Sequence, residues 1–278
     1  MTWRLRIEHV SGYRYKTPVQ ASYNEARITP LTTLTQTTID SRVDIAPTSR
    51  PYRYWDYWGT LVHAFDIHVP HVELVVTGAS TVETNPAPPL PTSVGWDNLE
   101  GDADERWEYL TPTDYVPLSE DLAEIAGEFR SCAGALDAAV AASSWVRSAM
   151  AYVPGTTGVS TSALEALATR QGVCQDFVHV FAGIMRSLGV PTRYVSGYLH
   201  PAKEPELGVA VKGQSHAWAE VWVGEWMAVD PTNGLPPGQR HVTVARGRDY
   251  RDVSPLKGIY SGGAAHALEV EVELTRIA

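Results

Sequence analysis

The sequence predicts an α+β protein in which an N-terminal antiparallel β-sandwich domain is followed by a core of helices packed on an antiparallel sheet. Residues 5–82 contain several short runs in which apolar and polar side chains alternate, and they contain no convincing helix. Helical periodicity dominates residues 119–190, and the two-residue alternation returns after Pro191. Helices followed by antiparallel strands are typical of the α+β class.

The strand-like runs of the first part lie at residues 4–8, 38–45, 61–69 and 72–76. Prolines and glycines separate these runs, as is usual for turns between short strands. Several short strands without a helix predict an antiparallel sandwich or a half-barrel.

A proline-rich segment divides the chain. Residues 85–91 read Asn-Pro-Ala-Pro-Pro-Leu-Pro, and this density of proline favours an extended connector. We therefore expect a β-rich domain over residues 1–84, a linker over 85–104 and a second domain over 105–278. Residues 268–274 alternate regularly, so a last strand with one solvent-facing side is expected, which could return to pair with a sheet.

Helix-start signals place the helices of the second domain. Ser119 stands before two acidic residues, and Ser162 with Glu165 has the spacing of a capping box. Apolar side chains recur at helical spacing over residues 138–150. A further helix is expected to begin near Cys174 and to end before a Gly-Val-Pro segment.

Composition and charge restrict the possible partners. The chain has 22 basic and 32 acidic residues, a formal net charge of −10 and no basic cluster that could follow a phosphate backbone, so nucleic acid is not expected. No run approaches the ~20 apolar residues of a membrane helix. The first residues alternate like a strand and do not form an apolar signal segment. We expect a cytoplasmic protein without membrane contact.

The two cysteines, Cys132 and Cys174, could in principle form a disulfide, but free thiols are expected in a cytoplasmic chain of this size. Cys174 stands where an irregular segment enters a helix, and the unpaired N–H groups of a helix start favour a thiolate. Gly172 is expected to let the backbone turn tightly there. From this context alone, Cys174 is either a nucleophile or a small buried apolar residue.

His216 and Asp230 lie on two predicted strands that a short turn connects. A two-residue turn at residues 224–225 would place Asp230 on the face opposite to His216. The apolar pattern favours an odd register, which collects the aliphatic side chains on one face and gathers His216, Trp218 and Asp230 on the other. The strand pairs of this register are Val221 with Met227 and Ala219 with Val229. It requires a three-residue loop or a bulge between the strands.

Cys174, His216 and Asp230 together form a nucleophilic triad by role. The thiolate attacks, the imidazole donates a proton to the leaving group, and the carboxylate orients the imidazole. Without that role, His216 would be an ordinary histidine at a strand end and Asp230 the first residue of an Asp-Pro turn. Zinc is a poor alternative, because no second cysteine or ligand-spaced histidine lies near either element.

These motifs resemble those of the bacterial transglutaminase-like superfamily. The similar segments are residues 172–177 (Gly-Val-Cys-Gln-Asp-Phe), 189–198, 215–221, 230–234 and 247–258. The first part is similar to the bacterial N-terminal domain that precedes this core, through Pro18, Val19, Ser22, Glu25, Ala26, Arg27, Pro70 and His71. The sequence departs from that pattern at Thr60, where asparagine is expected. The resemblance implies a papain-like core and the triad Cys174, His216 and Asp230.

Donors for an oxyanion hole are harder to assign from the sequence. The backbone N–H of Cys174 is expected to be one donor. Gln171 and Tyr152 are the candidates for a side-chain donor.

Further candidates lie around the expected cleft. Trp218 is a candidate to line it. Residues Arg248, Asp249 and Tyr250 either border the cleft or lock their own loop by hydrogen bonds. His179 lies five residues after Cys174 on the same helix, so it is expected to face away from the nucleophile and to be structural.

The sequence therefore predicts a thiol-dependent acyl-transfer enzyme that acts on an amide or peptide bond, with a peptide or protein amide as substrate. Hydrolysis is favoured over transamidation because water is always present. No metal or organic cofactor is expected, and no acidic loop suited to calcium is found. The alternative is a non-catalytic binding module that retains the fold.

Overall fold

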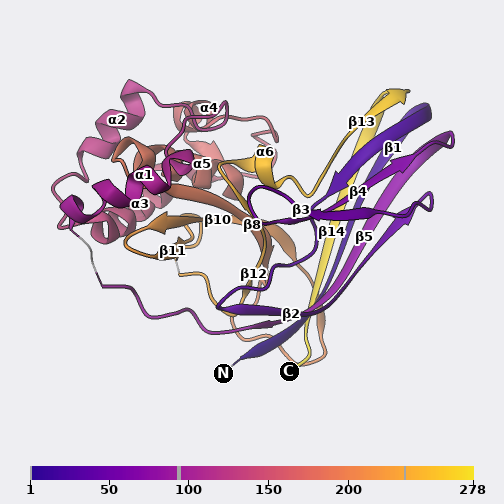
Figure 1. Ribbon diagram of the computed structural model, residues 1–278, viewed down its shortest axis with the longest axis horizontal. Helices are drawn as coiled ribbons and strands as arrows, with labels where there is room; N and C mark the ends of the chain where they lie inside the picture. Colours follow the sequence, from indigo (N-terminus) through magenta and orange to yellow (C-terminus); the bar gives the residue numbers. More distant parts are fainter. Residues whose placement is uncertain (1, 93–94, 235) are drawn as a thin grey trace.

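The computed structural model of the chain describes residues 2–92, 95–234 and 236–278. The helices gather on one side of the molecule and the long strands on the other (Figure 1). Helices and mostly antiparallel sheets occur in the same chain, which confirms the predicted α+β class. None of the helices in the described ranges is both long enough and apolar enough to cross a membrane.

The first sheet has eight strands and is antiparallel throughout. Its strands are β1 (Trp3–Ala26), β2 (Gln36–Ala46), β3 (Tyr52–Trp55), β4 (Leu61–Ile67), β5 (His71–Thr84), β9 (Ala210–Lys212), β13 (Leu256–Gly262) and β14 (Ala265–Arg276). They form one curled sheet, which corresponds to the half-barrel of the two forms expected.

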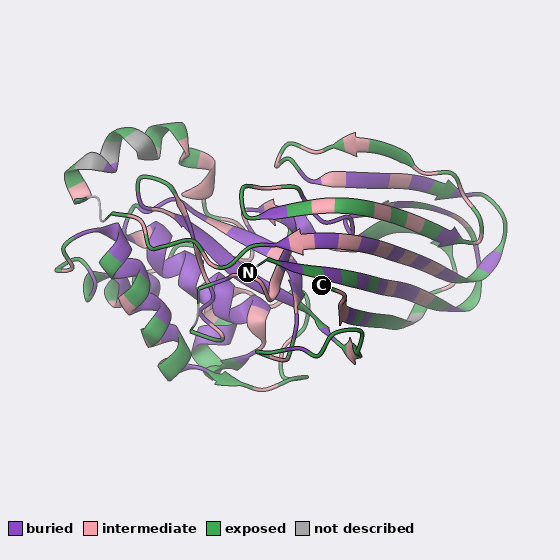
Figure 2. Ribbon diagram, turned by 90° about the horizontal axis from the view of Figure 1, so that it is seen from below, coloured by how far each residue is buried: buried purple, intermediate pink, exposed green. Residues whose placement is uncertain are grey.

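Strand β1 organises this sheet because it is long enough to pair with four other strands. Its first half lies between β5 and β14, and its second half lies between β4 and β13. Register shifts between Arg14 and Tyr15 and between Val19 and Ala21 interrupt the ladder, and such bulges bend a strand. Buried and exposed residues alternate along the long strands, as Figure 2 shows.

The C-terminal strand β14 returns to pair with a sheet, as the sequence suggested, and its partner is β1 of the first sheet. This sheet therefore combines residues from both ends of the chain. The predicted boundaries at residues 84 and 104 remain a prediction.

The second sheet has four antiparallel strands in the order β11–β10–β8–β12. They are β8 (Thr192–Leu199), β10 (Gln214–Trp222), β11 (Trp226–Val229) and β12 (His241–Gly247). A short parallel pair, β6 (Ala151–Tyr152) and β7 (Gln171–Gly172), leads into helix α5 (Cys174–Ser187).

Among the described helices, α3 and α5 are long and the others are short. The helices are η1 (Trp96–Asn98), α1 (Glu100–Glu105), η2 (Trp107–Tyr109), α2 (Glu120–Gly127), α3 (Ala135–Ala149), α4 (Ala163–Thr169), α5 (Cys174–Ser187) and α6 (Tyr250–Val253). The predicted caps are present: the Ser119 side chain accepts from the N–H of Leu122, and Ser162 and Glu165 form a capping box. Helix α5 is the central helix, because twelve of its fourteen residues are buried.

One hydrophobic core joins the helices to both sheets. Side chains of α2, α3, α4 and α5 pack with the inner face of the second sheet. Leu5, Val82 and Leu274 of the first sheet belong to the same cluster. Burying apolar surface stabilises by roughly 25 cal/mol per Å², so this shared core fixes the second sheet against the first. A buried hydrogen bond of 2.8 Å between His9 Nδ1 and Tyr198 Oη spans the same contact.

The β10–β11 hairpin has the predicted odd register. Ala219 pairs with Val229 and Val221 with Met227. Trp222 pairs with Trp226, so residues 223–225 form a three-residue loop, and the Val223 N–H donates to the Glu225 carbonyl across it. The aliphatic face of the hairpin packs in the core, and the opposite face carries His216 and Trp218.

Candidate active site

Cys174 is the first residue of helix α5. Asp176, in the first turn, accepts hydrogen bonds from the Val173 N–H at 2.7 Å and from Thr157 Oγ1 at 2.7 Å. Its carboxylate thereby takes one of the donors that a helix start leaves unpaired. The hydrogen bonds fix the entry of the chain into the helix and so fix the position of the Cys174 side chain.

Gly172 is required next to this helix start for a packing reason. A Cβ atom at position 172 would lie 2.5 Å from Asp176 Oδ2, which is closer than real contacts allow. Its backbone is not in the left-handed region. The expected tight turn is therefore not the reason for the glycine; the close approach of the Asp176 side chain is.

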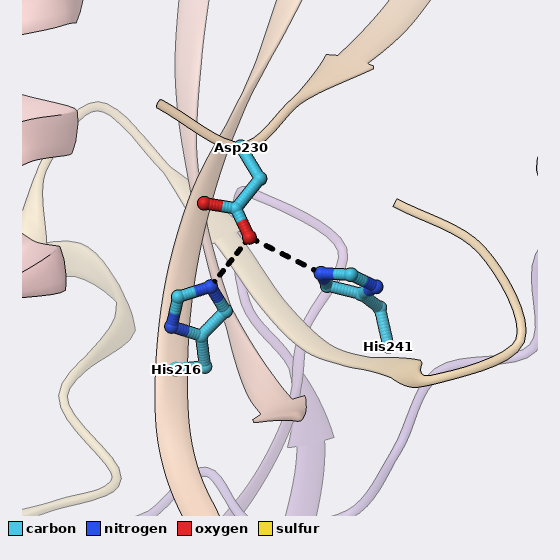
Figure 3. A group of neighbouring side chains, drawn as sticks. All are labelled: His216, Asp230 and His241. Atoms are coloured by element: carbon cyan, nitrogen blue, oxygen red, sulfur yellow. Dashed lines mark hydrogen bonds and ion pairs between the residues drawn. The ribbon is translucent and has the colours of Figure 1, made fainter. Parts of the chain in front are cut away.

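His216 and Asp230 are joined by a buried hydrogen bond. His216 Nε2 lies 2.8 Å from Asp230 Oδ2 (Figure 3). His216 comes from β10 and Asp230 follows β11 directly, so the odd register of the hairpin places both on one face. The predicted contact between these two side chains is confirmed.

The Asp230 carboxylate accepts hydrogen bonds at both oxygens. Oδ1 accepts from the N–H groups of Thr232 and Asn233, each at 3.0 Å. Oδ2 accepts from His216, from Asn233 Nδ2 at 2.8 Å and from His241 at 3.3 Å. Burial would raise the pKa of Asp230, but these donors outweigh it and lower the pKa below its ordinary value.

Cys174 lies close enough to His216 to influence the pKa of its ring. Because Nε2 is taken by Asp230, Nδ1 is the ring nitrogen available to the thiol. Burial lowers the pKa of His216, but the hydrogen bond to Asp230 and the nearby Cys174 raise it to about 9. His216 is therefore protonated at neutral pH and can supply a proton.

His241 is a site residue that the sequence reasoning missed. Its Nε2 donates to Asp230 Oδ2, and its Nδ1 accepts from the Gly238 N–H at 3.3 Å. Since Nδ1 is an acceptor, the proton of the neutral ring must be on Nε2, where it points at Asp230. Burial lowers the pKa of His241, and its hydrogen bond to Asp230 does not offset this. His241 is thus a neutral second donor to the carboxylate.

No signal near Cys174, His216 or Asp230 in the sequence pointed to His241. It begins strand β12, which pairs with β8 and not with β10 or β11. Its approach to Asp230 depends on how the four strands are ordered in the sheet. Asn233 could have been found, because an Asp-Pro-Thr-Asn segment predicts a turn whose backbone N–H groups face the aspartate.

His216, Asp230 and His241 could also be considered as metal ligands, since their ligand atoms all lie within 4.8 Å of one another. To bind a metal through Nε2, His241 would have to move its proton to Nδ1. There the proton would face the Gly238 N–H, which is itself a donor. The hydrogen bonds present fit a carboxylate held by two imidazoles better than a metal centre.

Trp218 is almost fully buried on the same face of the sheet. Its ring lies 6.1 Å from that of His216 and 5.3 Å from that of His241, centroid to centroid. It therefore packs beside both imidazoles and restricts their movement.

Tyr152 and Gln171 flank the nucleophile on the paired strands β6 and β7. Tyr152 is half exposed, and burial together with the nearby Cys174 raises its pKa. Gln171 is exposed, three residues before Cys174. Their assignment as oxyanion donors remains a prediction.

Arg248, Asp249 and Tyr250 lock their own loop by hydrogen bonds, which is one of the two roles expected. Arg248 forms an ion pair with Asp252 at 2.9 Å. Asp249 caps α6 by accepting from the Arg251 N–H. A role in lining the cleft remains a prediction.

His179 accepts a hydrogen bond from the Tyr250 N–H, and burial lowers its pKa to about 3, so it is a neutral structural residue. His71 is buried within the first sheet and packs edge-on against Tyr15. Cys132 and Cys174 are both free thiols.

Two family descriptions match parts of this chain. Residues 123–231 match the family described as the transglutaminase-like superfamily, and residues 5–83 match the bacterial transglutaminase-like N-terminal region. The first match contains Cys174, His216 and Asp230 and ends before His241.

Individual proteins are similar either to nearly the whole chain or to a part of it. An uncharacterized protein of Mycobacterium leprae is 48% identical over 99% of this chain and 100% of its own length. A protein-glutamine gamma-glutamyltransferase of Pseudomonas aeruginosa is 36% identical, but only over 25% of this chain and 11% of its own length. The crystal structure of a candidate cysteine protease of Cytophaga hutchinsonii has the same fold, with a TM-score of 0.76 and 22% identity over 100% of this chain and 93% of that chain.

Proposed function

Because the chain belongs to the transglutaminase-like superfamily, we propose that it is a thiol-dependent acyl-transfer enzyme. In this proposal Cys174 is the nucleophile, His216 is the general acid and base, and Asp230 orients His216. The substrate is an amide, in a peptide or a protein. Tyr152 or Gln171 would assist the backbone N–H of Cys174 in holding the oxyanion.

The reaction proceeds in two steps. In the first, the Cys174 sulfur adds to the carbonyl carbon, and the developing negative charge goes to the oxygen. The C–N bond then breaks, and His216 gives its proton to the departing amine. In the second step, neutral His216 takes a proton from water while the water oxygen attacks the thioester. Breaking the C–S bond releases the acid and restores the starting pair.

The buried pairing of His216 with Asp230, together with the nearby Cys174, supports this proposal. The buried bond of 2.8 Å to Asp230 holds the ring through Nε2 and leaves Nδ1 for the thiol. Burial removes competing water from the bond to Asp230, which strengthens it. A purely structural role for His216 would not explain why a cysteine at the start of a helix lies close to its ring.

Hydrolysis is proposed over transamidation because water is always available as the second nucleophile. The fold shared with the candidate cysteine protease is compatible with hydrolysis. The local similarity to a gamma-glutamyltransferase makes transfer to an amine the main competing outcome. A non-catalytic binding module with this fold is the other alternative.

A product analysis separates these possibilities. The enzyme is incubated with a synthetic peptide library in ¹⁸O water together with a primary amine that carries a tag. Hydrolysis places ¹⁸O in the new carboxyl groups, and transamidation places the tag on the acyl product. Mass spectrometry reads both from one sample.

The controls are single-cysteine variants. Cys132→Ala is expected to retain the products of the native protein, and Cys174→Ala is expected to form none. Products that persist in Cys174→Ala would contradict the proposed nucleophile. A native protein that forms neither product but still binds library peptides would favour the binding module.

A further inference from the structure

A cavity of about 590 Å³ lies against the face of the second sheet that also carries His241. Its sheet side is formed by residues of β8, β10, β11 and β12, and its other side by residues 33–36 together with Asn85, Pro86 and Pro88. Within the described part of the chain, neither Cys174 nor His216 lines it. The cavity therefore lies on the same face of the sheet as His216 but does not include the nucleophile.

A group of three charged side chains, of which Glu220 is buried and the two arginines are partly buried, lines this cavity. Glu220 Oε2 accepts from Arg193 Nε at 2.5 Å and from Arg246 Nε at 3.0 Å, and Glu220 Oε1 accepts from Arg246 Nη2 at 3.0 Å. Two guanidinium groups share one carboxylate, so the group carries one positive charge in excess. Burying a charge without a counter-charge is costly.

Arg246 has unused hydrogen-bonding capacity at this site. Its Nε and Nη2 are bound to Glu220, whereas Nη1 makes no hydrogen bond to any residue that the structure describes. A guanidinium group presents its N–H donors in a planar fork that matches the two oxygens of a carboxylate. An anionic ligand in the cavity would balance the excess positive charge and would accept a hydrogen bond from Arg246 Nη1.

Three tryptophans give the same cavity an apolar wall. They are Trp218, Trp222 and Trp226. The Arg193 guanidinium lies 4.0 Å from the centroid of the Trp226 ring, which positions it by a cation–π contact. Thr33 and Asn85 add hydroxyl and amide groups on the opposite side. The lining thus suits a ligand that combines an anionic group, an amide and an apolar side chain.

An acidic residue at the rim disfavours a ligand with more than one negative charge. Glu225, in the exposed hairpin loop, is the other acidic residue of the lining and repels a doubly charged ligand more strongly than a singly charged one. A phosphate ester carries about −1.5 to −2 charges at neutral pH and would be repelled more strongly. A carboxylate carries one charge.

We propose that this cavity binds the C-terminal carboxylate of a peptide, with the carboxylate on Arg246 and the adjacent side chain against the tryptophans. This site goes beyond the proposed acyl transfer, because Cys174 takes no part in it. The peptide terminus would lie next to His241, which also lines the cavity and donates to Asp230.

Binding is measured by isothermal titration calorimetry in the Cys174→Ala protein, so that the result does not depend on catalysis. The probes are N-acetyl-phenylalanine, its primary amide, and inorganic phosphate. The carboxylate is expected to bind roughly tenfold or more tightly than the amide, because only the carboxylate can pair with Arg246. Indole N–H signals of Trp222 and Trp226 in NMR spectra are expected to shift, whereas that of the exposed Trp55 is not.

The matched variants are Arg246→Gln and Arg251→Gln. In Arg246→Gln, Glu220 keeps its partner Arg193, so the fold is expected to persist, with thermal unfolding as the check. This variant should bind the carboxylate no better than the amide. Arg251 is exposed and paired with Asp114, away from the cavity, so its variant should behave like the parent.

Three results would overturn the proposal. One is equal binding of the carboxylate and the amide, or no binding of either up to about 10 mM. Another is tighter binding of phosphate than of the carboxylate. The third is an Arg246→Gln protein that folds and still prefers the carboxylate.

Discussion

His216 and His241 donate to the same oxygen of Asp230, and their ring centroids lie 5.9 Å apart. The pKa of His216 is raised to about 9, whereas the pKa of His241 is lowered. Two imidazoles on one carboxylate therefore hold different charges at neutral pH. The one in contact with Cys174 carries the proton, and the other remains neutral and acts only as a donor.

The first prediction concerns the pH dependence of activity. His216 must be protonated to act as the acid, so activity should decline as pH rises through about 9. The rate against pH, measured with a substrate from the product analysis, gives this basic limb. A limb near pH 6.5, the value of an unperturbed histidine, would contradict the paired arrangement.

The second prediction follows from the same pKa and concerns stability. A pKa raised on folding means that the folded state binds the proton more tightly. The resulting stability is fully present below about pH 6.5 and is lost as pH rises through about 9. Urea unfolding of the native protein and of His216→Gln should show a stability difference that shrinks across this window. A difference that grows with pH would oppose the prediction.

The third prediction tests His241 as a positioning residue. His241→Phe removes a donor to a buried carboxylate, a hydrogen bond of the kind that contributes about 1.5–3 kcal/mol. We expect kcat to fall roughly tenfold to a hundredfold, with a smaller change in KM. Asp230 would then attract the His216 proton more strongly, so the basic limb should move to higher pH.

His241→Gln is the matched control, because its amide can still donate to Asp230 and should restore much of the activity. If the phenylalanine and glutamine variants lose kcat equally and neither shifts the basic limb, His241 acts only in packing.

The fourth prediction concerns the reactivity of the thiols. Cys174 lies at the start of helix α5 and close to His216, a setting typical of reactive cysteines. Brief treatment with iodoacetamide at about pH 6 should modify Cys174 much faster than Cys132, as read by peptide mapping. His216→Gln should slow the modification of Cys174. Equal rates at the two cysteines would argue against activation.

The fifth prediction concerns Gly172. Gly172→Ala would force the new Cβ against Asp176 Oδ2, so the carboxylate must move away from the helix start. We expect a loss of about 1–3 kcal/mol in the free energy of unfolding together with lower activity. Gly158→Ala is the control, since a Cβ there meets nothing within 4 Å and the backbone is not left-handed. Equal unfolding midpoints for the two variants would show that the contact is unimportant.

The β10–β11 hairpin shows how far sequence patterns reach. Its register could be predicted because strand side chains alternate with period two, so a one-residue slip would put Met227 and Val229 on the face opposite to Ala219 and Val221. The observed register puts His216 and Asp230 on one face of the hairpin. The caps at Ser119 and Ser162 were predicted for a similar reason, since both depend on residues only three apart.

The sequence by itself determined the α+β class, the strand alternation, the helix starts and the two strands that bring His216 to Asp230. These features arise from interactions between residues close together in the chain. Only the tertiary structure decided that β14 completes the first sheet, that His241 reaches Asp230 from β12, and that Arg193 and Arg246 share Glu220 in a cavity. These contacts depend on the order of strands in a sheet and on a core common to both sheets. Alternation shows which face of a strand is buried but leaves open which strand lies beside it.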